Sequence, residues 1–110
     1  MSSKCIVELA DASFEAVVLN AQGPVLVLFW ATRSAPCEEV MPALDEIANS
    51  YRGKLLVGRI EIDSNPESKA RHGVRRVPTA MLFKNGNVKG NKVGVASKKE
   101  LQAILDASSI

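Results

Sequence analysis

Residues 25–37, which have the sequence VLVLFWATRSAPC, decide the fold of this chain. The first part, Val25–Trp30, is continuously apolar and rich in strand formers, as expected for a central strand that is buried on both faces. A helix is predicted next, over residues 34–50, because apolar residues recur there at helical spacing. Pro42 lies inside this helix and should kink it, because its ring crowds the preceding turn. A buried strand that leads directly into a helix indicates an α/β architecture.

The rest of the chain continues this alternation of strands and helices. We expect Asp11 to be the N-cap of a helix that ends near Leu19. Asn85-Gly86 predicts a tight hairpin between two strands, and Ser97 starts the last helix with a capping box. The other predicted elements are strands at 5–9, 55–62, 79–83 and 88–93 and a short helix at 66–72. The order β-α-β-α-β-α-β-β-α predicts one domain over residues 1–110, a mixed sheet of about five strands with helices on both faces.

Composition excludes several classes of protein. The chain has 110 residues, of which 46% are apolar and 24% charged, as in a soluble globular domain. A net charge of +2 is too weak a bias to suggest nucleic-acid binding. No apolar run approaches the length of a bilayer span, and no secretion signal is recognisable, so we expect no membrane partner. Two cysteines do not form a disulfide framework, and a cytoplasmic location fits best.

Ser34 and Cys37 occupy the two positions where a redox motif would have two sulfurs. A Cys-x-x-Cys pair at the start of a helix exchanges disulfides, because one thiolate attacks and the other resolves the mixed disulfide. Here Ser34 stands in the position of the attacking sulfur, and only Cys37 remains. A hydroxyl cannot form a disulfide, so the dithiol cycle is expected to be weak or absent.

Nearly the whole chain resembles the thioredoxin family. The residues that support this resemblance are spread over the sequence: Phe29–Ala31, Pro36-Cys37, Pro42, Ile62-Asp63, Asn65-Pro66, Val77–Thr79, Leu82–Gly86, Val93-Gly94 and Ser97. The resemblance implies the thioredoxin fold and a role in the thiol–disulfide chemistry that maintains cell redox homeostasis. It also implies a cis peptide bond before Pro78 and a substrate surface lined by Gly94.

The active site departs from the family's usual pattern. Active members have Trp-Cys-Gly-Pro-Cys, whereas residues 33–37 here are Arg-Ser-Ala-Pro-Cys. Members usually also have a buried aspartate on the central strand, and this position is Leu28; the lysine that commonly accompanies it is matched by Arg59. A single Cys-to-Ser replacement would explain Ser34 but not Arg33, Ala35 and Leu28. We therefore interpret the chain as a naturally divergent member with an atypical active site.

The remaining thiol has two interpretations. A cysteine near a helix N-terminus is favoured as thiolate, and Arg33 would act in the same direction. Alternatively, the resemblance places Cys37 below the surface, where a cysteine is often inert. Ser34 is expected to cap the helix by accepting a hydrogen bond from the N–H of Cys37, because Pro36 has none. His72, the one histidine, is expected to be a solvated residue at a helix end.

A partner-binding surface is the other implication of the resemblance. The backbone of Val77, before Pro78, would pair with an extended segment of a substrate or partner. Two arginines near this groove, Arg33 and Arg76, suggest an acidic or phosphate-bearing partner. The predicted groove consists of Trp30, Arg33, Ala35, Pro36, Arg76, Val77, Pro78 and Gly94.

Three functions remain open from the sequence. Cys37 alone could form mixed disulfides with glutathione or with a protein. The groove could instead bind a protein or peptide partner without electron transfer. Cys5 could pair between chains in a redox sensor, since the topology that the resemblance implies makes a bond to Cys37 improbable. No ligand cluster or glycine-rich phosphate loop occurs, so no metal, flavin or nucleotide cofactor is expected.

Overall fold

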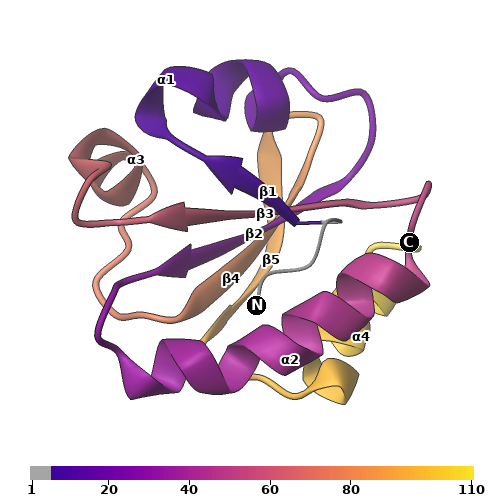
Figure 1. Cartoon of the computed structure of the whole chain (residues 1–110). Helices are drawn as coiled ribbons and strands as arrows, with labels where there is room; N and C mark the ends of the chain where they lie inside the picture. Colours follow the sequence, from indigo (N-terminus) through magenta and orange to yellow (C-terminus); the bar gives the residue numbers. More distant parts are fainter. Residues whose placement is uncertain (1–5) are drawn as a thin grey trace.

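Five strands form one sheet in the order β1-β3-β2-β4-β5 in the computed structural model, which describes residues 6–110 (Figure 1). The first three strands in this order are parallel, and β4 and β5 are antiparallel to their neighbours. The sheet is therefore mixed and five-stranded, as the sequence predicts. The strands are β1 Ile6–Leu9, β2 Val25–Trp30, β3 Leu56–Glu61, β4 Thr79–Lys84 and β5 Asn87–Val93.

Helices cover both faces of this sheet, which confirms the predicted architecture (Figure 1). One face is covered by α1 (Asp11–Phe14), the π-helical turn η1 (Glu15–Leu19) and α3 (Pro66–Arg71). The other face is covered by α2 (Ala35–Ser50), which contains Pro42, and by α4 (Lys98–Ala107). None of the helices within residues 6–110 has the length and hydropathy that crossing a bilayer demands.

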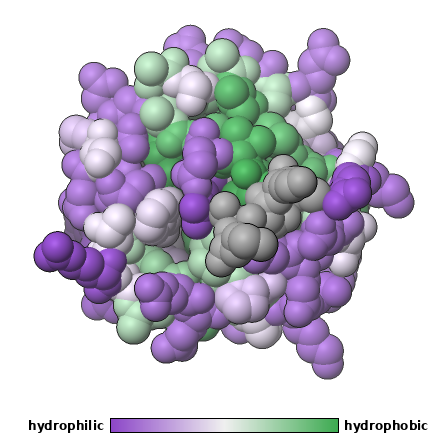
Figure 2. All heavy atoms as spheres, viewed as in Figure 1, coloured by the Kyte–Doolittle hydropathy of each residue, from purple (hydrophilic) through white to green (hydrophobic). Residues whose placement is uncertain are grey.

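The side chains of β2 alternate between two apolar cores. Leu26 and Leu28 belong to the core on the side of α2 and α4, whereas Val27 and Phe29 belong to the core on the side of α1 and α3. All four are at most 1% exposed, which confirms a central strand buried on both faces. On the face of the molecule that bears β1, apolar residues gather near the centre and hydrophilic residues surround them (Figure 2).

Two local predictions about turns and caps are confirmed. Asn85 and Gly86 have φ values of 54° and 80°, the left-handed pair that a tight hairpin between β4 and β5 requires. At the start of α4, the N–H of Glu100 donates to Ser97 Oγ at 3.1 Å, and the N–H of Ser97 donates to Glu100 Oε1 at 3.0 Å. This is the capping box predicted from the sequence.

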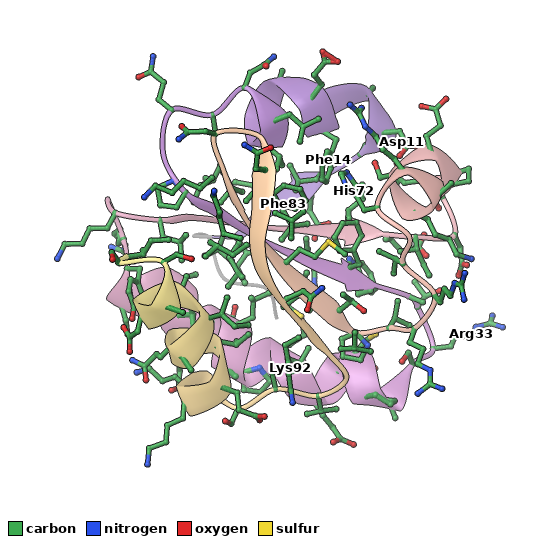
Figure 3. The ribbon with its side chains drawn as sticks, turned by 180° about the vertical axis from the view of Figure 1, so that it is seen from behind. Asp11, Phe14, Arg33, His72, Phe83 and Lys92 are labelled. Carbon is green, nitrogen blue, oxygen red and sulfur yellow. The ribbon has the colours of Figure 1, made fainter. Side chains whose placement is uncertain are left out.

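The predicted role of Asp11 is wrong. Ala10 is the N-cap of α1, and Asp11 is the first helical residue. The Asp11 carboxylate instead accepts hydrogen bonds from the N–H groups of Glu67 (3.1 Å) and Ser68 (2.8 Å) at the start of α3 (Figure 3). Partial desolvation raises the pKa of Asp11, but the hydrogen bonds from Ser68 and Glu67 outweigh it and lower that pKa overall. Asp11 thus joins α1 to α3, two segments far apart in the chain.

The prediction of a solvated His72 is also wrong. His72 does follow the end of α3, but its ring lies among three phenylalanines, with centroid distances of 5.0 Å to Phe14, 6.0 Å to Phe29 and 5.2 Å to Phe83 (Figure 3). Its Nε2 atom is buried and has no hydrogen-bond partner among the described residues. Burial, with a smaller contribution from the Arg71 charge, lowers the pKa of His72. The fold therefore favours the neutral imidazole.

We expect this histidine to make stability fall in mildly acidic solution. The unfolded chain binds the His72 proton near the ordinary pKa of 6.5, whereas the folded chain binds it only at lower pH. The free energy of unfolding should therefore be constant above about pH 7 and decrease as the pH falls through 6.5, with a slope of at most about 1.4 kcal/mol per pH unit. Urea unfolding of the native chain and of His72→Leu between pH 5 and 8 measures this effect.

The free energy of unfolding of His72→Leu should not decrease between pH 7 and pH 5. The carboxyl groups with lowered pKa, those of Asp11, Glu61 and Glu100, have ordinary values of 3.8 to 4.5 and affect stability only in more acidic solution. Equal slopes in both proteins would mean that His72 does not titrate differently on unfolding.

Candidate functional site

The ends of three strands, β2, β4 and β5, lie side by side at one end of the sheet and form the platform of the candidate site. Thr79 of β4 pairs with Phe29 of β2 on one side and with Val93 of β5 on the other. The residues just outside these pairs, Pro78 and Gly94, therefore adjoin the end of β2. The N–H of Gly94 donates to the carbonyl of Pro78 at 2.8 Å. Gly94 has a φ of 95°, a conformation that side-chain-bearing residues rarely adopt.

The peptide bond between Val77 and Pro78 is cis, as the resemblance implies. Pro78 itself is buried and Val77 is half-buried. The Thr79 hydroxyl donates to the carbonyl of Arg76 at 2.7 Å, and this bond fixes the path of the loop ahead of Pro78. Arg76 is exposed beside this loop.

Ser34 is the N-cap of α2, which confirms the sequence prediction. Its backbone is extended, with φ −107° and ψ 110°, and its hydroxyl accepts the N–H of Cys37 at 3.4 Å. The Ser34 carbonyl also accepts the N–H groups of Cys37 at 3.1 Å and Glu38 at 3.2 Å. Pro36 in the first turn has no N–H to satisfy. The Ser34 hydroxyl thus has a structural role at the start of α2.

Cys37 is buried, with 3% of its surface exposed. It nevertheless lines a cavity of about 200 Å³ that opens between the end of β2 and the start of α2. The other residues of this cavity are Trp30, Ala31, Thr32, Arg33, Ser34, Glu38, Met41 and Arg59. Cys37 is the one free cysteine within residues 6–110; Cys5 and the predictions made for it lie outside the described residues.

The predicted site residues fall into separate groups. Trp30, Arg33, Ser34 and Cys37 share the cavity, whereas Val77, Pro78 and Gly94 form the adjoining platform. Ala35 and Pro36 are exposed in the first turn of α2. Arg33 is exposed with a φ of 63°, and its side chain extends away from the body of the molecule (Figure 3). Arg76, predicted in the same groove, instead lines a separate groove between residues 72–76 and β5.

Arg59 and its partners are the part of the site that sequence reasoning does not locate. Its guanidinium lies 4.8 Å from the centre of the Trp30 ring and forms an ion pair with Glu8 on the neighbouring strand. It also approaches the Met41 sulfur at 3.8 Å. The Trp30 Nε1 atom is buried without a hydrogen-bond partner among the described residues. These contacts join residues that are far apart in the sequence. The one feature of the sequence that points to them is that Arg59 matches the family's lysine position.

Leu28 and Arg59 are direct neighbours across β2 and β3. Leu28 is 1% exposed and belongs to the apolar core beneath α2 and α4. The site therefore has a cation, Arg59, at its rim. At the position where the sequence comparison above expects the family's buried aspartate, it has the hydrocarbon side chain of Leu28. A buried carboxylate could accept the proton of a nearby thiol, whereas a leucine cannot. Within residues 6–110 no group of three or more histidine, cysteine, aspartate or glutamate residues lies close enough to hold a metal.

Comparison with known proteins places these observations in a family. The family model described as "Thioredoxin" matches residues 5–107. A thioredoxin of Pseudomonas aeruginosa is 52% identical over 106 residues, which are 96% of this chain and 98% of the relative. Thioredoxins of Acidithiobacillus ferridurans and Rhodospirillum rubrum are 43% and 44% identical, over 96% and 92% of this chain and 97% of each relative. With its five-stranded mixed sheet and the cis bond before Pro78, the chain belongs to the thioredoxin family.

Proposed function

We propose that this chain is a thioredoxin-family protein without a dithiol cycle, which binds extended segments of other proteins in the cytoplasm. Binding would occur on the platform of Val77, Pro78 and Gly94 together with the exposed residues 33–36. The observation that supports this proposal is the state of the redox pair. The hydroxyl of Ser34 caps α2 in place of the first sulfur, and Cys37 is only 3% exposed.

The chemistry of the pair excludes an internal disulfide. Reduction of a protein disulfide by a dithiol needs two sulfurs, because the second thiol displaces the mixed disulfide formed by the first. Ser34 offers an oxygen that is not appreciably ionised near neutral pH. Leu28 offers no carboxylate to take a proton from Cys37. With one thiol, the protein cannot form the internal disulfide through which a dithiol reductase passes an electron pair to its substrate.

The binding surface does not depend on the missing sulfur. An extended segment is recognised mainly by backbone hydrogen bonds to an exposed strand-like segment, with side-chain pockets adding specificity. The backbone around Val77 is held by the Thr79–Arg76 and Gly94–Pro78 hydrogen bonds, neither of which involves Ser34 or Cys37. Arg33, which is exposed among residues 33–36, favours an acidic segment as the partner.

A second candidate function, monothiol chemistry at Cys37, is favoured by the cavity of about 200 Å³ that this residue lines. The Cys37 thiolate would attack the disulfide of oxidised glutathione or of a protein. The product is a mixed disulfide at Cys37 and one released thiolate, and an external thiol would then restore Cys37.

Retention of partners from native cell extract tests both candidates. We expect the immobilised chain and Cys37→Ser to retain the same proteins, with and without reductant. Arg33→Glu should weaken retention on the order of tenfold, because a like charge would face an acidic segment. Lys54→Glu, an equal charge change on an exposed loop before β3, is the matched control and should retain them fully.

The outcomes separate the two functions. Partners that reductant releases and that Cys37→Ser fails to hold would replace the non-covalent proposal with monothiol chemistry. Equal retention by Arg33→Glu and Lys54→Glu would overturn the proposed binding surface at the cis-proline platform.

A further inference from the structure

The modest net charge of the chain conceals a strong segregation of charge. Residues 69–99 contain nine of the fourteen basic residues and none of the twelve acidic ones. This segment runs from α3 through the loop before β4, the β4–β5 hairpin and the first residues of α4. The rest of the chain is correspondingly acidic. One edge of the sheet, the edge formed by β5, therefore lies in a basic region.

Several of these basic side chains lack a compensating acid. Lys92 pairs with Glu100 at 2.9 Å, and Lys98 lies 3.7 Å from Glu46. By contrast, Arg75, Arg76 and Lys89 have no salt-bridge partner within residues 6–110. All three are exposed.

One face of β5 is covered and the other is open. Lys92 points to α4 (Figure 3), where it meets Glu100. A Cβ atom at position 90 would lie 2.8 Å from the Ile104 side chain of α4. The alternate residues Asn91 and Val93 pair with Met81 and Thr79 and line an open groove of about 300 Å³.

The wall of this groove is basic and its edge is apolar. The groove is bounded by residues 72–76, which include Arg75 and Arg76. Val93 is 53% exposed, and Val88, which pairs with Phe83 on the same face of the hairpin, is 46% exposed. An exposed valine beside uncompensated arginines, with a second exposed valine farther along the same face, is a surface suited to a partner that is both apolar and acidic.

The outer side of β5 also offers backbone hydrogen bonds. β5 is the last strand of the sheet, so the N–H and C=O groups on its free side have no neighbouring strand among residues 6–110. Lys89 lies at the register shift between β4 and β5, where Leu82 pairs with Gly90 but Phe83 pairs with Val88. A basic edge repels a second copy of the same edge and attracts a strand of opposite charge.

We propose that β5 is a docking edge for an extended, acidic segment of another protein, which adds to the sheet as a further strand. Its backbone bonds the free side of β5, its apolar side chains cover Val88 and Val93, and its carboxylates face Arg75, Arg76 and Lys89. This site is separate from the platform of Val77, Pro78 and Gly94, and it requires no thiol.

The test uses the whole chain and a fluorescent peptide of alternating glutamate and valine. We expect the peptide to bind in fluorescence anisotropy, to shift the backbone amide resonances of β5 and residues 72–76, and to bind more weakly as salt is added. Arg75→Glu and Lys89→Glu should each weaken binding on the order of tenfold, because a carboxylate would face the peptide's carboxylates. Lys54→Glu has the same net charge as these two variants, but its substitution precedes β3, which β2 and β4 separate from β5. It should bind the peptide as the native chain does.

A second peptide, methylated on every backbone nitrogen, distinguishes strand addition from simple charge attraction. It should bind much more weakly, since it cannot donate hydrogen bonds to β5. Equal binding of the methylated peptide, or equal weakening by Lys54→Glu and Lys89→Glu, would overturn the proposal. So would shifts of the β5 resonances by a single-stranded oligonucleotide but not by the peptide, or a dimer formed through β5. Because Arg75 and Lys89 lie outside the cis-proline platform, failure here leaves the proposed function untouched.

Discussion

Replacing Ser34 with cysteine is expected to raise the rate of insulin reduction, with dithiothreitol as electron donor, by at least about 100-fold, because loss of an essential nucleophile costs that much or more. The new sulfur would stand at the N-cap of α2, with Cys37 in the first turn of the same helix. One thiol could then attack the substrate and the other could resolve the mixed disulfide. The rate of insulin precipitation measures the gain.

Two control variants isolate the effect of the second sulfur. Ser34→Ala removes the cap but adds no thiol, so its activity should stay at background. Ser34→Cys combined with Cys37→Ser has an attacking sulfur but no resolving one, and should give mixed disulfide without turnover. If Ser34→Cys alone remained at background, then Arg33, Ala35 or Leu28, rather than the missing sulfur, would block the chemistry.

Replacing Leu28 with aspartate is expected to lower the free energy of unfolding at pH 8 by about 3–5 kcal/mol, the cost of leaving a charge buried without a partner. Leu28 is 1% exposed within an apolar core. The neighbouring Arg59 is occupied by Glu8 and by the ring of Trp30. Leucine at position 28 therefore spares the fold the cost of a buried carboxylate. It also leaves the site without the proton acceptor that a carboxylate would provide.

The dependence of this loss on pH separates charge from shape. Burial raises the pKa of a carboxyl group, so the folded variant would bind a proton that the unfolded chain has already released. The stability of Leu28→Asp, measured against Leu28→Asn, should therefore decrease as the pH rises from about 4 to 8. Urea unfolding of both variants at several pH values provides the measurement. A constant difference would show that Arg59 neutralises the introduced charge.

The features predicted from the sequence depend on neighbouring residues. The apolar run of β2, the cap at Ser34, the Asn85-Gly86 turn and the capping box at Ser97 are all determined within a few positions. Local patterns of this kind also establish the alternation of strands and helices, from which the mixed sheet follows.

The features that were missed join distant parts of the chain. The predictions for Asp11 and His72 failed because each considered only the helix nearby. The partners of the Asp11 carboxylate are Glu67 and Ser68 of α3, and the phenylalanines around His72 come from α1, β2 and β4. A polar residue beside a helix end usually caps the helix or lies in solvent, and this local rule predicts the wrong role for both side chains. The position of Arg59 over Trp30 likewise requires β2 and β3 to be paired first.

Insulin turnover by the variant Cys5→Ser, in which Cys37 is the one remaining thiol, tests the central claim most directly. We expect precipitation no faster than dithiothreitol alone produces, and no internal disulfide in the mass of the oxidised protein. Sustained turnover at a rate typical of dithiol thioredoxins, with Cys37 as the sole sulfur able to exchange, would contradict the account.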